Sequence, residues 1–329
     1  MIGVIGGSGF IGSRLCNRLK NRGSNFFIVD KKTSQEFEYL NILADVRDLK
    51  KLDISISKEC SLIFNLAAEH KDDIYPKSLY DEVNVNGARN VCIVAKAKNI
   101  NAIVFTSSVA VYGFAPLGTN ESGVMAPFND YGRTKAEAEQ VYKKWQAEDP
   151  QNRILVIIRP TVVFGERNRG NVFNLLKQIV SGKFVMVGDG LNRKSLAYVE
   201  NVAAFLEFSM SFKPGIHIYN YIDKPDFTMN ELVARVNRIL GCSEKINFRL
   251  PYFIGLAVGK CFDFIAFVAR KKLAISSIRV KKFCANSVYE SAIAETGFVP
   301  PVNLIDAIER TVKYEFLEDH KKEPVYYSE

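Results

Sequence analysis

A tyrosine and a lysine four residues apart, Tyr131 and Lys135, are the pair in this sequence best suited to chemistry. Residues at positions i and i+4 share one face of a helix. A phenol titrates near pH 10, so it acts as a base at neutral pH only where a cation, here the Lys135 ammonium, stabilises the phenolate. The pair is therefore a candidate proton-transfer centre, although the same spacing also arises by chance on solvated helices.

The start of the chain predicts an element that would bring a redox cofactor to this pair. An apolar strand at residues 2–5 runs directly into the sequence GGSGFIG, and a helix follows. Glycines in such a turn let the backbone approach a pyrophosphate, whose charge is favoured at the N-terminus of the next helix. The residues expected at this dinucleotide site are Gly6, Gly9, Phe10, Ile11 and Gly12.

An acid follows the second predicted strand, residues 26–29, at Asp30. It stands about twenty residues after the glycine turn, where a carboxylate accepts hydrogen bonds from a ribose. This favours NAD over NADP as the cofactor. Lys31 and Lys32 could instead neutralise a 2'-phosphate, but a solvated turn explains them equally simply.

Apolar strands alternate with amphipathic helices, which predicts an α/β fold with a Rossmann-type doubly wound parallel sheet and a smaller C-terminal substrate-binding lobe. We expect residues 1–160 to form the dinucleotide-binding domain, with 192–222 returning to it, and residues 161–191 and 223–329 to form the lobe. Strands are expected at 2–5, 26–29, 43–46, 62–66, 103–107, 154–158 and 217–221. Helices are expected at 11–22, 80–98, 131–147, 172–181, 201–210, 229–240 and 304–315.

Bulk composition is that of an ordinary globular protein: 329 residues, 47% hydrophobic and 24% charged. The six cysteines are scattered without a CxxC pair and there are three histidines, so we expect no metal site and a reducing, cytoplasmic location. No secretory signal is expected, because the first strand begins at the first methionine.

Ser107 ends the strand expected at 103–107 and Ser108 follows it, and catalytic groups gather at the carboxyl ends of parallel strands. The segments TSSVAVYG, YGRTK and GGSGFIG together resemble the extended short-chain dehydrogenase/reductase family, particularly its sugar epimerases. The resemblance implies that Ser108 binds the substrate oxygen, with Ser107 as the alternative. It also implies that Tyr131 is the acid/base and Lys135 its activator.

The same resemblance implies further cofactor contacts. Asp45 and Val46 match an adenine-contacting pair, the turn after residue 65 matches a cofactor-lining segment, and Asn84 matches a polar residue that supports the active-site helix. Each could also be a satisfied structural group. The cofactor contacts added in this way are Asp45, Val46, Leu66, Ala67, Ala68, Asn84 and Lys135.

The implied reaction begins with removal of a proton from a sugar hydroxyl and of hydride from the same carbon. Return of hydride to the other face gives epimerisation, whereas release of the ketone gives an oxidoreductase. Dehydratases of the family carry an Asp-Glu pair where Val109 and Ala110 stand here, so dehydration is disfavoured.

Positive charge is concentrated in residues 245–282, which hold nine Lys or Arg and one acid, Asp263, and so carry the whole net charge of +8. Within this stretch lies an apolar segment that is interrupted by Lys260 and Asp263 and followed by Arg270, Lys271 and Lys272. It falls short of the roughly 20 apolar residues of a spanning helix, so we expect a helix in the membrane interface. The alternative is a buried helix whose basic neighbours bind a pyrophosphate; no nucleic-acid-binding module is recognisable.

Two later blocks, residues 159–170 and 276–284, narrow the resemblance to O-antigen pathway epimerases that convert N-acetylglucosamine to N-acetylgalactosamine on undecaprenyl pyrophosphate. This implies a lipid-linked amino sugar, a peripheral position on the inner membrane, and a homodimer through the helices near Tyr80 and Tyr131. Residues 192–195 replace the Arg-Asp pair of many nucleotide-sugar enzymes. Guanidinium groups bind phosphate bidentately. The candidates are Arg167, Arg169, Arg193 and Arg279.

Three other functions stay open at this point. They are a soluble UDP-N-acetylhexosamine 4-epimerase, a 4-keto-sugar reductase that consumes NAD(P)H, and a dinucleotide-binding protein without catalytic activity.

Overall fold

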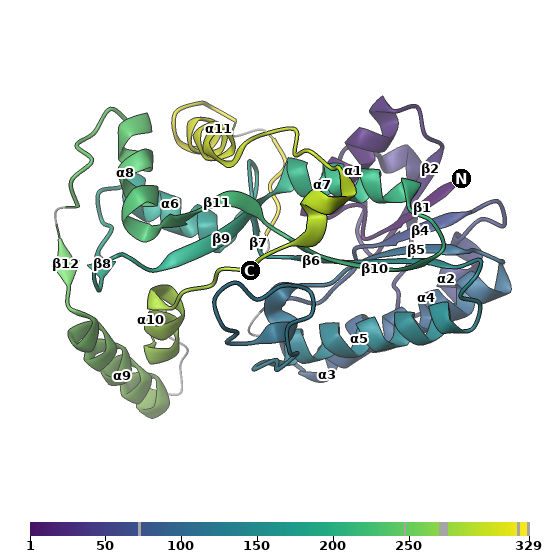
Figure 1. Ribbon diagram of the computed structural model, residues 1–329, viewed down its shortest axis with the longest axis horizontal. Helices are drawn as coiled ribbons and strands as arrows, with labels where there is room; N and C mark the ends of the chain where they lie inside the picture. The colour runs from purple at the N-terminus through teal and green to yellow at the C-terminus, as the bar shows by residue number, and fades with distance from the viewer. Residues whose placement is uncertain (72–73, 247, 270–275, 321–322, 328–329) are drawn as a thin grey trace.

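The computed structural model describes residues 1–71, 74–246, 248–269, 276–320 and 323–327. Its larger part is a seven-stranded parallel sheet with the strand order β10-β6-β5-β4-β1-β2-β3 (Figure 1). The strands are β1 (Ile2–Ile5), β2 (Phe26–Asp30), β3 (Asn41–Leu43), β4 (Leu62–Asn65), β5 (Ala102–Thr106), β6 (Ile154–Pro160) and β10 (Gly215–Tyr221).

Helices cover both faces of this sheet, with α1 and α7 on one side and α2, α4 and α5 on the other (Figure 1). Leu15 and Phe205 lie in the core of the first face, and Val91 and Trp145 in that of the second. The central strands are buried on both sides, which explains their continuous apolar sequences. The predicted Rossmann-type α/β fold is thus confirmed. These helices are α1 (Phe10–Asn21), α2 (Leu49–Ser55), α4 (Gly87–Ala97), α5 (Asp130–Ala147) and α7 (Val199–Phe208).

Several short helices complete this part of the chain. They are α3 (Ser78–Tyr80), a π-helix (Asp81–Asn86) and three 3₁₀-helices, Glu38–Leu40, Val109–Tyr112 and Ser209–Ser211. The first two and α4 replace the single helix expected at 80–98.

The lobe contains a three-stranded sheet, ordered β11-β9-β7, and a two-stranded sheet of β12 and β8. Helices α6, α8 and α11 pack around a core that includes Leu176, Val233 and Ile308. The strands are β7 (Val162–Phe164), β8 (Met186–Val187), β9 (Arg193–Tyr198), β11 (Asp223–Thr228) and β12 (Arg249–Leu250). The helices are α6 (Asn171–Val180), α8 (Met229–Ile239), α9 (Tyr252–Ala269), α10 (Ser277–Cys284), the 3₁₀-helix Ala292–Thr296 and α11 (Leu304–Phe316).

Helix α9 touches the rest of the lobe through two glycines. A Cβ atom on Gly255 would lie 2.6 Å from Val187 Cγ1, and one on Gly259 would lie 2.8 Å from the Cα of Ser277. These glycines are the buried residues of α9. Asp263, which interrupts the apolar sequence, accepts a hydrogen bond from the Ser277 backbone N–H at 3.2 Å and so caps α10.

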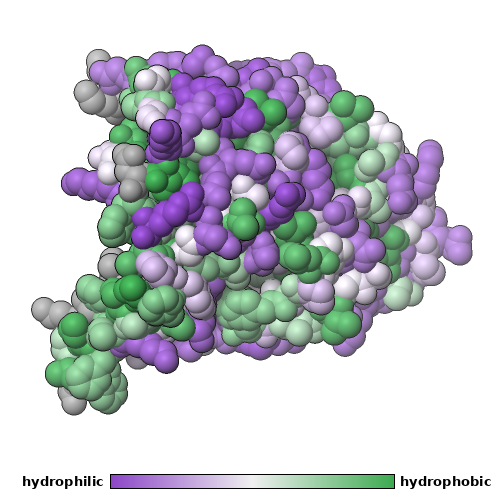
Figure 2. Space-filling view, turned by 60° about the vertical axis from the view of Figure 1, so that its left-hand side comes forward, coloured by the Kyte–Doolittle hydropathy of each residue, from purple (hydrophilic) through white to green (hydrophobic). Residues whose placement is uncertain are grey.

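The large apolar side chains of α9 are therefore exposed, and Figure 2 shows apolar surface on the projecting corner of the molecule where α9 lies. By length and composition α9 could cross a membrane, with only 11% of its residues buried. A core helix of a lobe would be mostly buried, so the structure does not follow the buried-helix alternative. The basic residues Arg270, Lys271 and Lys272 lie outside the described residues. The exposed side chains are Tyr252, Phe253, Ile254, Val258, Phe264, Ile265, Phe267 and Val268.

Candidate active site

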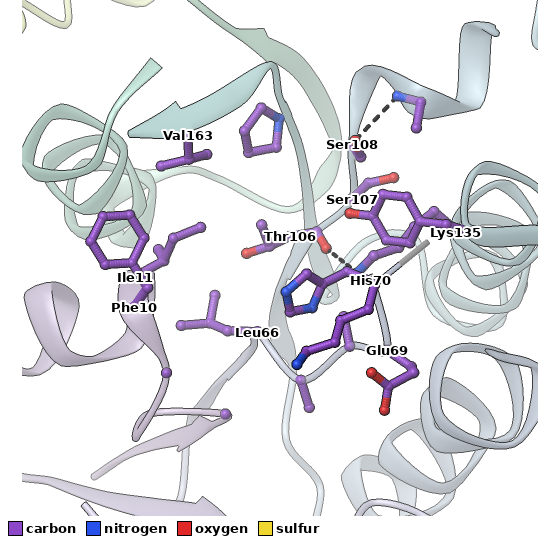
Figure 3. A pocket seen from close by; sticks show the side chains of 18 of the residues that line it. Phe10, Ile11, Leu66, Glu69, His70, Thr106, Ser107, Ser108, Lys135 and Val163 are labelled. Carbon is purple, nitrogen blue, oxygen red and sulfur yellow. Dashed lines mark hydrogen bonds between the residues drawn. The ribbon is translucent and has the colours of Figure 1, made fainter. Parts of the chain in front are cut away.

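A cavity of about 1150 Å³ lies between the carboxyl ends of the sheet strands and the lobe. Its lining includes Gly6 after β1, Leu66 after β4 and Ser107 after β5. The strand order reverses between β1 and β4, and ligands of open α/β sheets bind at such a reversal. Figure 3 shows Phe10 and Ile11 on one side of the cavity and Ser108 and Lys135 on the other.

The glycine turn lines this cavity with backbone atoms that carry no side chains. Gly6 has φ 81°, and a Cβ atom there would lie 2.6 Å from the Ala67 backbone nitrogen. A Cβ atom on Gly12 would overlap the Gly6 carbonyl oxygen, so α1 starts tightly against the turn itself. Helix α1 begins at Phe10, and its free N–H groups and dipole favour an anion at this point.

Asp30 ends β2 at the edge of the cavity. Its carboxylate accepts hydrogen bonds from the backbone N–H groups of Ser8, at 3.0 Å, and Lys32, at 3.1 Å. Burial nevertheless raises the pKa of Asp30 above its usual value. These bonds fix the carboxylate beside the glycine turn, and its remaining lone pairs can accept hydrogen bonds from a diol.

All but one of the predicted cofactor residues line the cavity. The exception is Asn84, whose side-chain amide accepts from the Glu69 N–H at 2.9 Å and donates to the Glu69 carbonyl at 3.0 Å and to Thr134 Oγ1 at 2.9 Å. Asn84 therefore joins the loop after β4 to α5 rather than facing a ligand. The lining residues are Gly6, Gly9, Phe10, Ile11, Gly12, Asp30, Asp45, Val46, Leu66, Ala67, Ala68 and Lys135.

Lys135 lies on α5 with its ammonium inside the protein. The residue is 2% exposed, and its Nζ donates to the Thr106 carbonyl at 2.7 Å (Figure 3). The ammonium also lies 4.6 Å from the centre of the Phe105 ring. Burial lowers the pKa of Lys135 to about 7, so the amine can lose its proton near neutral pH.

Tyr131 lies one turn before Lys135 on α5 and also lines the cavity. Burial raises its pKa above 10, and a hydrogen bond with the Ser108 hydroxyl opposes this rise. The direction is opposite to the one expected from the Lys135 charge, because burial of the phenol dominates its pKa. The phenol therefore holds its proton in this geometry.

The two serines have different tasks. Ser108 Oγ accepts a hydrogen bond from the Ala110 N–H at 3.1 Å and caps the 3₁₀-helix after it, which leaves its hydroxyl proton for other partners (Figure 3). Ser107 Oγ instead donates to Glu139 Oε1 at 2.6 Å. The geometry therefore favours Ser108 over Ser107 as the group that meets a substrate.

Glu139 also forms a buried ion pair that sequence reasoning missed. Arg159 NH2 lies 2.6 Å from Glu139 Oε2, and both side chains are almost fully buried. Arg159 further donates to the Tyr112 hydroxyl at 2.6 Å. This network holds the segment that carries Ser108 against α5 and β6, so its role is to position the site.

None of the four arginines predicted to grip phosphate lines the cavity within the described part of the chain. Arg167 pairs with Glu36 at 2.7 Å, and Arg169 pairs with Glu315 at 2.7 Å. Arg193 and Arg279 are exposed. Arg167 and Arg169 thus pair with acids from distant parts of the chain, and no local sequence motif reveals these ion pairs.

The lobe instead contributes two lysines to the cavity, Lys194 and Lys282. Lys194 Nζ donates to the Lys282 carbonyl at 2.8 Å and to the Ala285 carbonyl at 2.5 Å. Burial lowers the pKa of Lys194 to about 8. Lys194 belongs to the block 192–195. The difference between this block and the Arg-Asp pattern of nucleotide-sugar enzymes was the feature of the sequence that pointed to this position.

The C-terminal segment closes the cofactor end of the cavity. The Tyr326 backbone donates to the Arg167 carbonyl at 2.7 Å and accepts from the Arg169 N–H at 2.7 Å. The Tyr326 ring lies 5.9 Å from that of Phe10. Val325, Tyr326 and Tyr327 all line the cavity, and no sequence motif had pointed to them.

The profile of the NAD dependent epimerase/dehydratase family matches residues 2–220. The chain belongs to this family. Membership confirms the family predicted from the glycine turn and the Tyr-Lys pair, and with it an NAD-dependent enzyme.

Among the relatives of this epimerase/dehydratase, an N-acetyl-alpha-D-glucosaminyl-diphospho-ditrans,octacis-undecaprenol 4-epimerase from Escherichia coli is 45% identical, over 99% of this chain and 98% of the relative. A UDP-N-acetylglucosamine 4-epimerase from Bacillus cereus has the same fold, with TM-score 0.72 at 18% identity over 94% of this chain and 97% of that one. So has a UDP-glucose 4-epimerase from Thermotoga maritima, with TM-score 0.75 at 20% identity over 95% and 97%.

The residues of this family member fit NAD. The Gly6 backbone cradle and the start of α1 suit a pyrophosphate, because any side chain on Gly6 would fill the space. Asp30 presents a fixed carboxylate to a ribose. An acid at this point suits the free 2'-hydroxyl of NAD better than the 2'-phosphate of NADP.

Proposed function

We propose that this protein is a 4-epimerase that converts N-acetylglucosamine to N-acetylgalactosamine on undecaprenyl pyrophosphate, in O-antigen biosynthesis. The observation that carries the proposal is the hydrogen-bonded pair of Tyr131 and Ser108 in the cavity of a chain 45% identical to a lipid-linked sugar 4-epimerase. Within this proposal the cofactor contacts are the twelve predicted residues that line the cavity.

Tyr131 acts as the acid and base of the reaction. In the phenolate form, its Oη takes the proton of the sugar C4 hydroxyl, while the Ser108 hydroxyl donates a hydrogen bond to the same oxygen. When bound, NAD accepts hydride from C4 and returns it. The 4-keto sugar turns over in the cavity before hydride returns to its other face, and Tyr131 then gives the proton back to the C4 oxygen. Oxidation and reduction balance, so cofactor is not consumed.

Lys135 positions and tunes this centre. Its bond to the Thr106 carbonyl fixes the ammonium beneath the cavity floor, between α5 and the end of β5. A positive charge held there stabilises the phenolate form of Tyr131, which is the form that acts as the base.

Lys194 and Lys282 are better candidates than the four arginines for binding the substrate pyrophosphate. Both line the cavity, whereas none of the four arginines does so within the described residues. A lysine ammonium binds phosphate as a point charge, and the low pKa of Lys194 rises as an anion approaches.

Substrate choice is the direct test of the proposal. Purified protein is incubated with undecaprenyl-pyrophosphate GlcNAc in detergent and, separately, with UDP-GlcNAc, and the released sugars are analysed by chromatography. The lipid-linked sugar should be epimerised without added NADH. Epimerisation of UDP-GlcNAc alone would overturn the lipid-linked substrate, and stoichiometric consumption of NADPH with a 4-keto sugar would indicate a reductase instead.

The same protein should sit on the cytoplasmic face of the inner membrane through α9. Its large apolar side chains are exposed, Lys260 lies within that helix, and Lys245 and Arg249 precede it in the sequence. An apolar helix with flanking cations binds an anionic lipid surface. The lipid-linked substrate lies in that surface, so attachment brings enzyme and substrate together.

The family resemblance also supports a homodimer through the helices near Tyr80 and Tyr131. Ile93 on α4 is 49% exposed, which leaves an apolar residue on that face for a second copy. Sedimentation analysis of wild type and Ile93→Glu checks this: the variant should be monomeric, and a monomeric wild type would contradict the dimer.

A further inference from the structure

Two phenylalanines stand at the cavity with their rings stacked on each other. The ring centres of Phe114 and Phe128 are 4.6 Å apart with 28° between the ring planes, and both residues line the cavity. Phe114 is 63% exposed and Phe128 45% exposed. Large apolar rings left open to water beside a binding cavity mark a place where a ligand removes them from water.

The loop that carries the pair is fixed to the body of the protein. Gly113 has φ 65°, and a Cβ atom there would overlap the Ala126 carbonyl, so the two ends of the loop meet closely. The Gly118 N–H donates to the Val288 carbonyl at 3.0 Å. Arg159, buried beneath, donates to the Glu121 carbonyl at 3.2 Å. The exposure of the rings is therefore built into the fold and is not a result of a free loop.

Positive charge borders the aromatic pair. Lys282 Nζ lies 5.1 Å from the centre of the Phe128 ring, and the Lys194 ammonium is bonded to the backbone carbonyl of the same Lys282. One cavity therefore holds the hydroxyl groups of Ser108 and Tyr131, two lysines, and an apolar pair that Lys282 borders. A sugar pyrophosphate joined to a hydrocarbon chain carries the three matching kinds of group: hydroxyls, negative charge and apolar surface.

We propose that Phe114 and Phe128 bind the first isoprene units of the substrate's polyprenyl chain, next to a pyrophosphate held by Lys282. This inference rests on the lipid-linked substrate proposed above and names the part of the protein that recognises the lipid. It makes the pair a specificity determinant, because a nucleotide sugar has no hydrocarbon at this point.

The surroundings favour hydrocarbon over a nucleobase. Leu117 and Val124, on the same loop, are 62% and 84% exposed, and Ile278 on the neighbouring α10 is 47% exposed. A base carries hydrogen-bonding edges that need polar partners, whereas an isoprene chain gains from apolar contact alone. Further apolar side chains on the same loop and on α10 are thus exposed to water and available to a hydrocarbon chain.

The experiment uses soluble short-chain substrates, so that membrane attachment plays no part. GlcNAc joined through pyrophosphate to a farnesyl chain is compared with UDP-GlcNAc as substrate for wild type and for a variant with Phe114→Ala and Phe128→Ala. Removing each ring exposes a few tens of square ångströms of apolar area that the farnesyl chain would otherwise cover. The resulting loss of binding free energy should lower kcat/KM for the farnesyl substrate about tenfold, mostly by raising KM. Any basal turnover of UDP-GlcNAc should change by less than about twofold.

Two further variants keep the interpretation unambiguous. A protein with Phe114→Leu and Phe128→Leu retains apolar bulk and should recover most of the farnesyl activity. Leu317→Ala removes an exposed apolar side chain elsewhere and should behave as wild type. NAD content and thermal unfolding of each protein report whether the fold is intact.

Equal losses on the farnesyl and UDP substrates, or no loss on either, would overturn the role of the pair while leaving the proposed epimerase in place. Failure of the wild type to epimerise the farnesyl substrate, with UDP-GlcNAc turned over, would instead remove the lipid-linked function itself. The wild-type result and the variant result therefore separate the two hypotheses.

Discussion

Replacing Lys135 with methionine should abolish activity and, at neutral or acidic pH, make the fold more stable. The lysine is 2% exposed, and burial lowers its pKa from 10.5 to about 7. Forcing the protonated form into the folded state below pH 7 therefore costs about 5 kcal/mol, at about 1.4 kcal/mol for each tenfold change in proton affinity. Methionine avoids this cost but loses the bond to the Thr106 carbonyl, worth about 2 kcal/mol, so the expected gain at pH 6 is about 2 to 3 kcal/mol.

The pH dependence of this gain follows from proton binding. Between pH 7 and pH 10.5 the unfolded chain still holds the Lys135 proton and the folded chain has released it, so the wild type becomes more stable as pH rises. The free-energy cost of burying protonated Lys135 has its full value below pH 7 and falls to zero toward pH 10.5. The advantage of Lys135→Met over wild type should therefore shrink by about 2 to 3 kcal/mol between pH 6 and pH 9.

Urea unfolding of nucleotide-free protein at both pH values measures this, with the buried Trp145 as the fluorescent probe. Lys144→Met, at an exposed position on the same helix, is the matched control and should show no such pH-dependent difference. If the difference in free energy of unfolding between Lys135→Met and wild type stays constant from pH 6 to pH 9, the reasoning is refuted. It is also refuted if the variant is less stable than wild type at pH 6.

Three further predictions follow from the site and from α9. Ser108→Ala should lower kcat about 100-fold with NAD still bound, whereas an unchanged kcat in steady-state assays would exclude a hydrogen bond to the reacting oxygen. Glu139→Gln should destabilise the fold by about 3 kcal/mol in urea unfolding, because it leaves buried Arg159 without its charge partner. Exposed Glu137→Gln is its control and should shift stability by less than about 0.5 kcal/mol. Phe264→Asp with Phe267→Asp on α9 should release the protein from anionic vesicles in flotation, and Val299→Asp should not; retention of both would show that α9 is not the attachment point.

The sheet and the catalytic residues could be predicted because their signals are local. The strand at residues 2–5 runs directly into a glycine turn, and Tyr131 and Lys135 lie on one helix. Each such pattern is complete within a few residues and depends little on the remainder of the chain. Even so, the pKa of Tyr131 rises where the pair predicted a fall, because burial depends on the whole fold and not on the local spacing of Tyr131 and Lys135.

The lobe could not be predicted in the same way. Strand β7 has three residues, and β9 (RKSLAY) and β11 (DKPDFT) contain many polar residues, so hydrophobic periodicity does not identify them. Arg167 was a reasonable phosphate ligand until Glu36, 131 positions earlier, was found beside it. The sequence left α9 open between a buried and an exposed helix, and the exposure of its large apolar side chains decides the question.

The close packing at Gly255 and Gly259 joins α9 to the lobe at a small number of positions. Gly255 and Gly259 must keep their identity for the helix to pack, since any side chain there would overlap Val187 or Ser277, and Asp263 adds its hydrogen bond to Ser277. The exposed outward positions of α9 do not line the active-site cavity, so their sequence can change without altering the catalytic groups. Where the enzyme is located and what it catalyses can therefore evolve at separate rates in one chain.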